Sequence, residues 1–148
     1  MMMINHMVTG AVIAFTVKEP LLALPLAVLS HFVLDSIPHF GDNDQGVSKE
    51  GYFPRFKKSV LIADAVLTVI FMSWLIANGF MLAIVCAVAA ASPDFVWIYR
   101  EIVLKIRGSL KPRNVISKFH ETVQWYEKRW AIIIDVAYLA FMLRILAL

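Results

Sequence analysis

Five apolar segments, separated by polar or helix-breaking residues, constrain the fold of this chain more than any other feature. A helix that crosses a bilayer needs about 20 apolar residues, within a range of roughly 17–25. The chain is 60% hydrophobic and 17% charged, whereas soluble domains have about 45–50% apolar and about 25% charged residues. The sequence therefore predicts an all-α, polytopic membrane helix bundle of about five transmembrane helices, with residues 1–148 forming a single domain. The segments are residues 1–17, 20–37, 59–77, 80–99 and 130–148.

The first two segments are short, and we expect them to form an N-terminal helical hairpin. Lys18 and Glu19 separate them, and Pro20 suits the first turn of the second helix. Small side chains on both helices would let the two backbones approach closely. These small residues are Gly10, Ala11, Ala14, Ala23 and Ala27.

The third and fourth segments form a second predicted hairpin. Asn78 and Gly79 give a turn signal between them. In the fourth segment, Ser92, Pro93 and Asp94 are expected to interrupt the helix, because proline removes a backbone donor and clashes with the preceding turn.

Two longer polar connections complete the chain. Residues 40–58 are predicted to be a loop, and residues 100–129 are basic. In the second connection apolar residues recur at helical spacing, which predicts a cytoplasmic amphipathic helix. Those apolar residues are Val115, Ile116, Phe119, Val123 and Tyr126.

The basic residues predict the orientation. Twelve of the fourteen Lys and Arg residues lie in the two long connections. The positive-inside rule then places both connections and the N-terminus in the cytoplasm, and the C-terminus outside the inner membrane. The net charge of +3 is too small to indicate nucleic acid as a partner, and the single cysteine, Cys86, excludes a disulfide within the chain.

A polar motif at the end of the second segment is the first candidate site. His31, Asp35 and His39 follow one another at spacings of four residues, which places the first two on one helix face. Pro38 is expected to kink or end the helix before His39. Two core histidines and a helix cap would be the structural alternative.

Other ionisable residues fall at a similar predicted depth. At a rise of about 1.5 Å per residue, His6 and His31 both lie roughly 19 Å from the turn at Lys18. Asp64 and Asp94 lie roughly 22 Å from Gly79 by the same rule, and Asp135 is five residues past Trp130. Ionisable groups inside membrane spans are costly and usually mark a functional site.

Structural roles remain open for each of these residues taken singly. His6 suits an interfacial position, Asp64 suits a helix start, and Asp94 suits a cap beside Pro93. Asp135 suits a pair with a nearby basic residue, and it is also a possible additional residue of the site. His120 and Glu121 belong to the amphipathic helix, where a solvated face and an additional role in the site are both open.

Taken together, the buried set predicts a metal site. Several carboxylates close together repel one another unless a cation neutralises them. Imidazole and carboxylate ligands suit a divalent transition metal, with zinc the first expectation and manganese or iron the alternatives. The set is His6, His31, Asp35, His39, Asp64 and Asp94.

Several stretches of the chain resemble small bacterial inner-membrane proteins described as membrane-bound, metal-dependent hydrolases. The resemblance rests on Asn5 and His6 followed by Gly10 and on the sequence of residues 30–39. It extends more loosely to Asp64 and to residues 92–94. It implies metal binding and hydrolysis, with His6, His31, Asp35 and His39 as the supported ligands.

The sequence thus favours a membrane-embedded hydrolase acting on a lipid or lipid-linked phosphoester at the cytoplasmic leaflet. The metal would activate water, with Asp64 and Asp94 as the candidate catalytic carboxylates. Membrane lipid and a small amphiphilic or phosphorylated substrate are the expected partners. A cation or proton transporter and a non-catalytic membrane scaffold are the alternatives.

Overall fold

The computed structural model describes residues 1–41, 55–98, 122 and 127–147. These residues form five α-helices and one 3-10 turn, and they contain no β-strand. The all-α class predicted from the sequence is confirmed for this part of the chain. The elements are α1 (Met3–Val17), α2 (Pro20–Asp35), α3 (Arg55–Ala77), α4 (Met81–Ile98), the turn η2 (Arg129–Ala131) and α6 (Ile132–Leu146).

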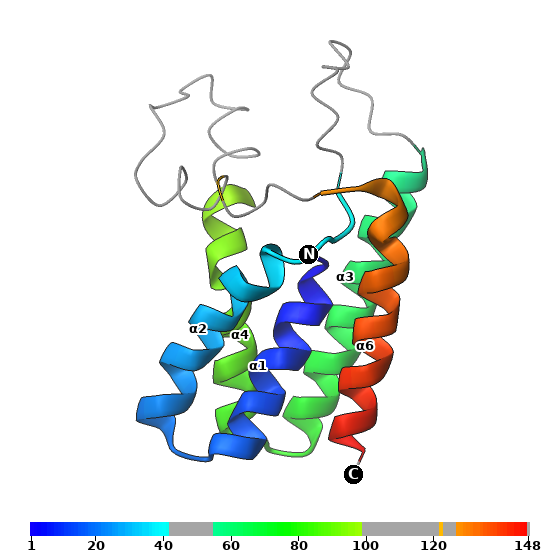
Figure 1. Cartoon of the computed structure of the whole chain (residues 1–148). Helices are drawn as coiled ribbons and strands as arrows, with labels where there is room; N and C mark the ends of the chain where they lie inside the picture. Colours follow the sequence, from blue (N-terminus) through cyan, green and yellow to red (C-terminus); the bar gives the residue numbers. More distant parts are fainter. Residues whose placement is uncertain (42–54, 99–121, 123–126, 148) are drawn as a thin grey trace, which may run out of the picture.

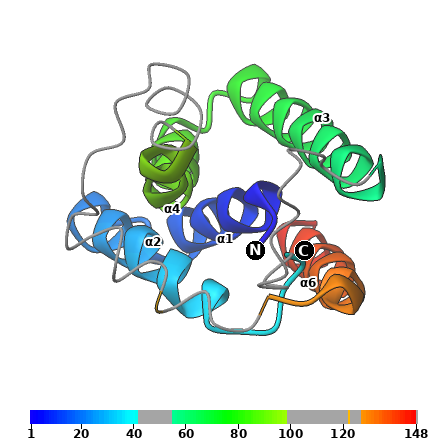
Figure 2. The ribbon, with the colours of Figure 1, turned by 90° about the horizontal axis from the view of Figure 1, so that it is seen from above.

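Helix α1 lies in the middle of the bundle, and the other four helices surround it (Figure 1 and Figure 2). Successive helices run in alternating directions, so α1 begins at the end of the bundle where α2 and α4 finish (Figure 1). This arrangement suits the sequence of α1, which has small residues on several sides. The hairpin of α1 and α2 matches the prediction, with Ala11, Ala14, Ala23 and Ala27 all buried.

Gly10 serves a different neighbour from the one expected. A Cβ atom at this position would collide with the backbone carbonyl of Cys86. Gly10 therefore lets α1 pack tightly against α4 rather than against α2. Because α1 and α4 pack closely, the last turns of α4 lie beside the first turns of α1, where the candidate site is found.

Two predicted helix boundaries need correction. Helix α3 begins at Arg55, inside the region predicted as a loop, and Pro54 precedes it in the sequence, as suits a helix start. Helix α4 is continuous through Pro93, where an interruption was predicted. Proline cannot donate to the carbonyl of Ala89, but the hydroxyl of Ser92 donates to that carbonyl at 2.8 Å instead.

The outward faces of the surrounding helices are apolar. Among the described residues, one helical segment, Lys58–Ala77, is long and apolar enough to cross a membrane. The segments Met3–Val17, Pro20–Asp35 and Met81–Phe95 are apolar but shorter. Exposed large apolar side chains on α2, α3 and α6 include Leu21, Leu29, Val33, Ile62, Val69, Ile70, Ile133, Val136 and Phe141.

The predicted amphipathic helix falls mostly outside the described residues. His120 and Glu121 lie outside them, so the structure does not place these two candidates. Residues 42–54 of the first long connection are also outside the described part of the chain.

Candidate metal centre

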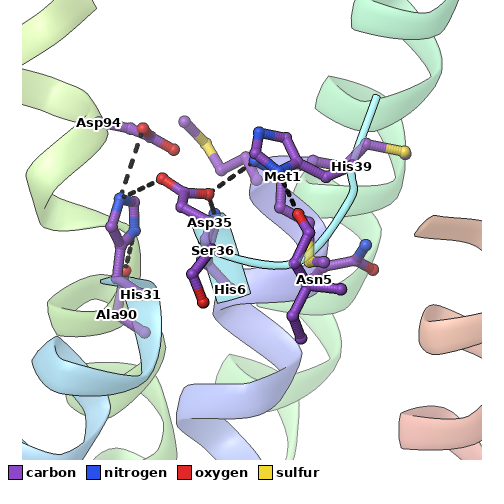
Figure 3. A network of polar contacts seen from close by, with 12 residues as sticks. Met1, Asn5, His6, His31, Asp35, Ser36, His39, Ala90 and Asp94 are labelled. Atoms are coloured by element: carbon purple, nitrogen blue, oxygen red, sulfur yellow. Dashed lines mark hydrogen bonds and ion pairs between the residues drawn. The ribbon is translucent and has the colours of Figure 1, made fainter. Parts of the chain in front are cut away.

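Three helices bring imidazole and carboxylate groups together at one end of the bundle (Figure 3). His6 lies in the first turn of α1, and Asp35 is the last residue of α2. Asp94 lies in the last turns of α4. His31 lies one turn before Asp35 on the same face of α2, as its spacing predicted.

Asp35 is the centre of this cluster. Its Oδ1 atom lies 3.2 Å from Nε2 of His6, and its Oδ2 atom lies 3.2 Å from Nε2 of His31. The α-ammonium group of Met1 also donates to Oδ1, at 2.7 Å. The side chains of Asp35 and both histidines are fully buried.

His31 is held with one ring nitrogen on backbone and the other facing carboxylates. Its Nδ1 atom lies 2.9 Å from the carbonyl oxygen of Ala90. A carbonyl can only accept, so Nδ1 carries the proton and, in the neutral ring, Nε2 carries the lone pair. Nε2 faces Asp35 and lies 3.7 Å from Oδ1 of Asp94. Histidines that bind metals are oriented in this way, with the second nitrogen donating to a carbonyl or carboxylate.

His6 packs on His31 with its ring nitrogens unsatisfied. The two rings are stacked, with centroids 4.1 Å apart and planes inclined by 24°. Within the described part of the chain, neither ring nitrogen of His6 makes a well-formed hydrogen bond, although Oδ1 of Asp35 lies 3.2 Å from its Nε2. A buried polar group without a partner costs about 1–3 kcal/mol. Nδ1 of His6 therefore has no hydrogen-bond partner among the described residues, and its Nε2 has the ion-pair contact with Asp35.

The donor set fits a divalent transition metal. His6, His31 and Asp94 each offer a ligand atom, and these atoms lie within 4.8 Å of one another. Asp35 adds a second carboxylate in contact with both imidazoles. Zinc ligands lie about 2.0–2.2 Å from the ion, so small movements would bring His6, His31 and Asp35 into coordination.

Asp64 and Asp135 lie beside this cluster and cap the start of α1. The backbone N–H groups of Met3 and Ile4 donate to the two carboxylate oxygens of Asp64, each at 2.9 Å. Asp135 accepts from the side chain of Asn5 at 2.9 Å. Its other oxygen accepts from the backbone N–H of Phe40 at 2.7 Å.

These contacts satisfy backbone donors that a helix start leaves without intrahelical partners, and they place negative charge at the positive end of the helix dipole. The ionisable residues predicted at a common depth therefore lie at the same end of the bundle. However, two of the carboxylates bind backbone N–H groups of α1 and its neighbours instead of facing the histidines.

His39 lies outside the helices and pairs with Glu127. Its Nδ1 atom donates to the carbonyl of Ile37 at 2.7 Å. Its buried Nε2 makes no hydrogen bond to the described residues and lies 3.9 Å from Oε1 of Glu127. The backbone N–H of Lys128 donates to the carbonyl of His39 at 3.0 Å. Sequence analysis did not single out Glu127, because it resembles the other polar residues of a predicted amphipathic helix and no local pattern marks its distant partner.

No protein-family model matches the chain, and comparison with curated proteins and with solved structures gives no match. The chemistry of the cluster is therefore inferred from its own residues.

Proposed function

We propose that this protein is an integral membrane, metal-dependent hydrolase. His6, His31 and Asp35 hold the metal, and Asp94 positions the attacking water. The substrate is a lipid or lipid-linked phosphoester at the cytoplasmic leaflet. One observation carries the proposal: Nδ1 of His31 is fixed on the Ala90 carbonyl while its Nε2 faces two carboxylates. Zinc is the expected ion, and manganese or iron suits the same donors.

A divalent cation satisfies the cluster better than protons do. Protons on Nε2 of both rings would pair them with Asp35, but Nδ1 of His6 would still lack a hydrogen bond among the described residues. One ion can accept the lone pairs of both imidazoles and neutralise the carboxylate between them. In the present structure the Met1 ammonium group supplies positive charge to the carboxylate of Asp35. A bound cation would supply positive charge to the same carboxylate.

The number and exposure of the donors favour catalysis over a purely structural ion. Catalytic zinc sites commonly have three protein ligands and keep a position open for water or substrate. When bound, the ion polarises a phosphoryl oxygen and lowers the pKa of water. Asp94 lies on the more open side of the cluster, since its side chain is 18% exposed while that of His31 is fully buried. Asp94 is thus suited to accept a proton from the water.

Asp64 has a different proposed role from the one its depth suggested. Both of its oxygens accept backbone N–H groups of α1. We therefore assign it to positioning α1 and, through α1, His6. Of the two candidate catalytic carboxylates, Asp94 remains as the base.

The apolar outward faces of α2, α3 and α6 support placement in a membrane. The cluster lies near the ends of α1, α2 and α4, which corresponds to headgroup depth if these helices stand in a bilayer. The basic connections favour the cytoplasmic side. Transport sites usually lie near the bilayer midplane, so the position at one end favours hydrolysis over transport. A non-catalytic scaffold would gain no stability from burying His6 with ring nitrogens that lack hydrogen bonds to the described residues.

The test is elemental analysis of detergent-purified protein, followed by assays with a panel of phospholipids and isoprenoid phosphates. We expect about one equivalent of transition metal, and phosphoester hydrolysis that stops with a chelator and returns when the ion is restored. Folded protein that neither retains nor takes up metal would contradict the site. Metal-loaded protein without chelator-sensitive hydrolysis would contradict the activity.

A further inference from the structure

A lateral groove runs along the side of the bundle, and its upper end lies at the level of the candidate metal centre. It has a volume of about 450 Å³ and is lined by residues of α1 and α2, with Tyr138 contributing from α6. In the described structure α2 and α6 do not contact each other, so the groove is open along its length. Figure 2 shows the two helices on opposite sides of α1.

The surface of the groove is suited to hydrocarbon. Its hydroxyl groups are turned away from any ligand: Thr16 donates to the Val12 carbonyl and Ser30 to the Ala27 carbonyl. Thr9 donates to the Asn5 carbonyl and also contacts the hydroxyl of Tyr138 at 2.8 Å.

The remaining lining residues are mainly aliphatic. Leu26, Leu29 and Val33 form part of the α2 wall and are 45%, 58% and 62% exposed. Since the hydroxyls already have protein partners, the lining favours a ligand that needs no hydrogen bonds.

None of the proposed ligands lines the groove, but residues next to them in the chain form its upper end. Ser30 and Leu34 line the groove and directly precede His31 and Asp35 in the chain. On α1, the lining residue Thr9 is one helical turn from His6. The groove continues down α1 to Val17, a distance of about 12 Å for eight helical residues.

We infer that this groove binds one hydrocarbon chain of the substrate, whose phosphoester headgroup lies at the metal centre. This inference rests on the proposed function and narrows its substrate to an amphiphile with a long chain attached close to the phosphoester. Water-soluble phosphoesters would lack the chain and bind poorly. The membrane supplies such an amphiphile through the open side of the groove.

A second groove provides an internal control. It has a volume of about 360 Å³, lies between α3 and α6, and is lined by residues such as Leu67, Ile70 and Leu139. Its lining residue on α1 is Ile4, whose backbone N–H binds Asp64. This groove therefore adjoins the cap of α1 instead of the histidines, and it should contact only bulk lipid.

The experiment is photo-crosslinking in phosphatidylcholine nanodiscs. Zinc-loaded protein is combined with a trace of phosphatidic acid that carries a diazirine in one chain, and labelled peptides are mapped by mass spectrometry. We expect labelling of the α1 and α2 walls of the groove, with competition by unlabelled phosphatidic acid and none by added phosphatidylcholine. The α3–α6 groove should show neither enrichment nor competition.

Matched variants test whether the groove itself binds the chain. Val33→Trp narrows the groove, and we expect about a tenfold loss of competable labelling, equivalent to about 1.4 kcal/mol. Val69→Trp is the control, since Val69 is 64% exposed on α3 and lines neither groove. It should label as the wild type does.

Several outcomes would overturn the inference. These are equal labelling of both grooves, labelling that phosphatidic acid cannot displace, or a second copy of the chain cross-linked at the α2 wall. If short-chain and long-chain phosphoesters were hydrolysed at equal rates, the inference that the groove binds the chain would be wrong. The proposed function would still stand. Competable labelling without hydrolysis would support the groove and contradict the proposed function.

Discussion

At the scale of single residues, the orientation of His31 is the main support for the proposed metal site. Its Nδ1 is committed to a backbone carbonyl on α4, and its Nε2 is directed at Asp35 and Asp94. His39 repeats half of this arrangement, with Nδ1 on the Ile37 carbonyl, but the carboxylate near its Nε2 is that of Glu127. The two histidines therefore form a matched pair for mutation.

His31→Ala and Asp35→Asn should each remove most of the metal from purified protein, measured by mass spectrometry of the bound element. Changes outside the first coordination shell typically cost about 10–100-fold in affinity, and loss of a direct ligand should cost more. His39→Ala should retain the metal. Equal loss in all three variants would mean that the site includes His39 or that metal content reports folding alone.

The two candidate catalytic carboxylates should respond differently to amidation. Asp94→Asn should keep the metal and lose about 10²–10⁴-fold in hydrolysis rate, the usual contribution of a positioned base. Asp64→Asn should instead lower stability by about 1–3 kcal/mol, since an amide cannot accept two backbone N–H groups with both of its terminal atoms.

The measurements are initial rates on metal-loaded protein and thermal unfolding in detergent. The assignment of the base would be wrong if Asp64→Asn lost rate without losing stability, or if Asp94→Asn kept the wild-type rate.

At the scale of the helices, α4 shows how a proline can be accommodated close to a site. Ser92 donates to the carbonyl that Pro93 leaves without a partner, and the next carbonyl, that of Ala90, accepts from His31. The helix therefore stays continuous while its last turns present both a carbonyl and Asp94 to α2.

A double-mutant cycle tests this role of Ser92. Ser92→Ala should destabilise the protein by about 1–3 kcal/mol, because it leaves the Ala89 carbonyl unsatisfied. In a Pro93→Ala background the backbone N–H is restored, so the same serine change should cost much less. Thermal unfolding of the four proteins gives the coupling, and additive effects would show that the hydroxyl does not replace the missing donor.

The helices could be predicted from the sequence more readily than the contacts between them. Apolar segment length and the helical rise gave the element order and the shared depth of His6, His31, Asp64, Asp94 and Asp135. They did not give the rotation of each helix about its axis, which decides whether a carboxylate at that depth meets a histidine or the start of α1. The continuity of α4 was missed because it depends on a side-chain hydrogen bond, and the pairing of His39 because its partner is remote in the chain.

At the scale of the whole molecule, a buried polar cluster at one end and apolar outward faces determine how the bundle would lie in a bilayer. The turns at Glu19 and Asn78 lie at the opposite end from the start of α1 (Figure 1). Orientation can therefore be read from a small number of exposed positions.

In a Cys86→Ala background, single cysteines at Glu19 and Asn78 should react with an impermeant thiol reagent added outside intact cells. A cysteine at Lys128 should react only after the membrane is opened, because the basic connections are expected to stay in the cytoplasm. All three positions are exposed in the structure, so access should depend on the membrane. External labelling at Lys128 would reverse the orientation, and with it the leaflet that presents the substrate.

The capping of α1 by Asp64 and Asp135 also bears on how the protein is made. The contact between the backbone of Met2 and Asp135 joins residues 133 positions apart in the chain, so α1 leaves the ribosome long before the carboxylate from α6 exists. Such distant contacts form late, because long segments must be ordered before the contact is gained. Until then the buried donors at the start of α1 depend on water or on other partners. The last helix to be translated thus completes the environment of the first, and a nascent chain that stalls before Asp135 would carry an unfinished site.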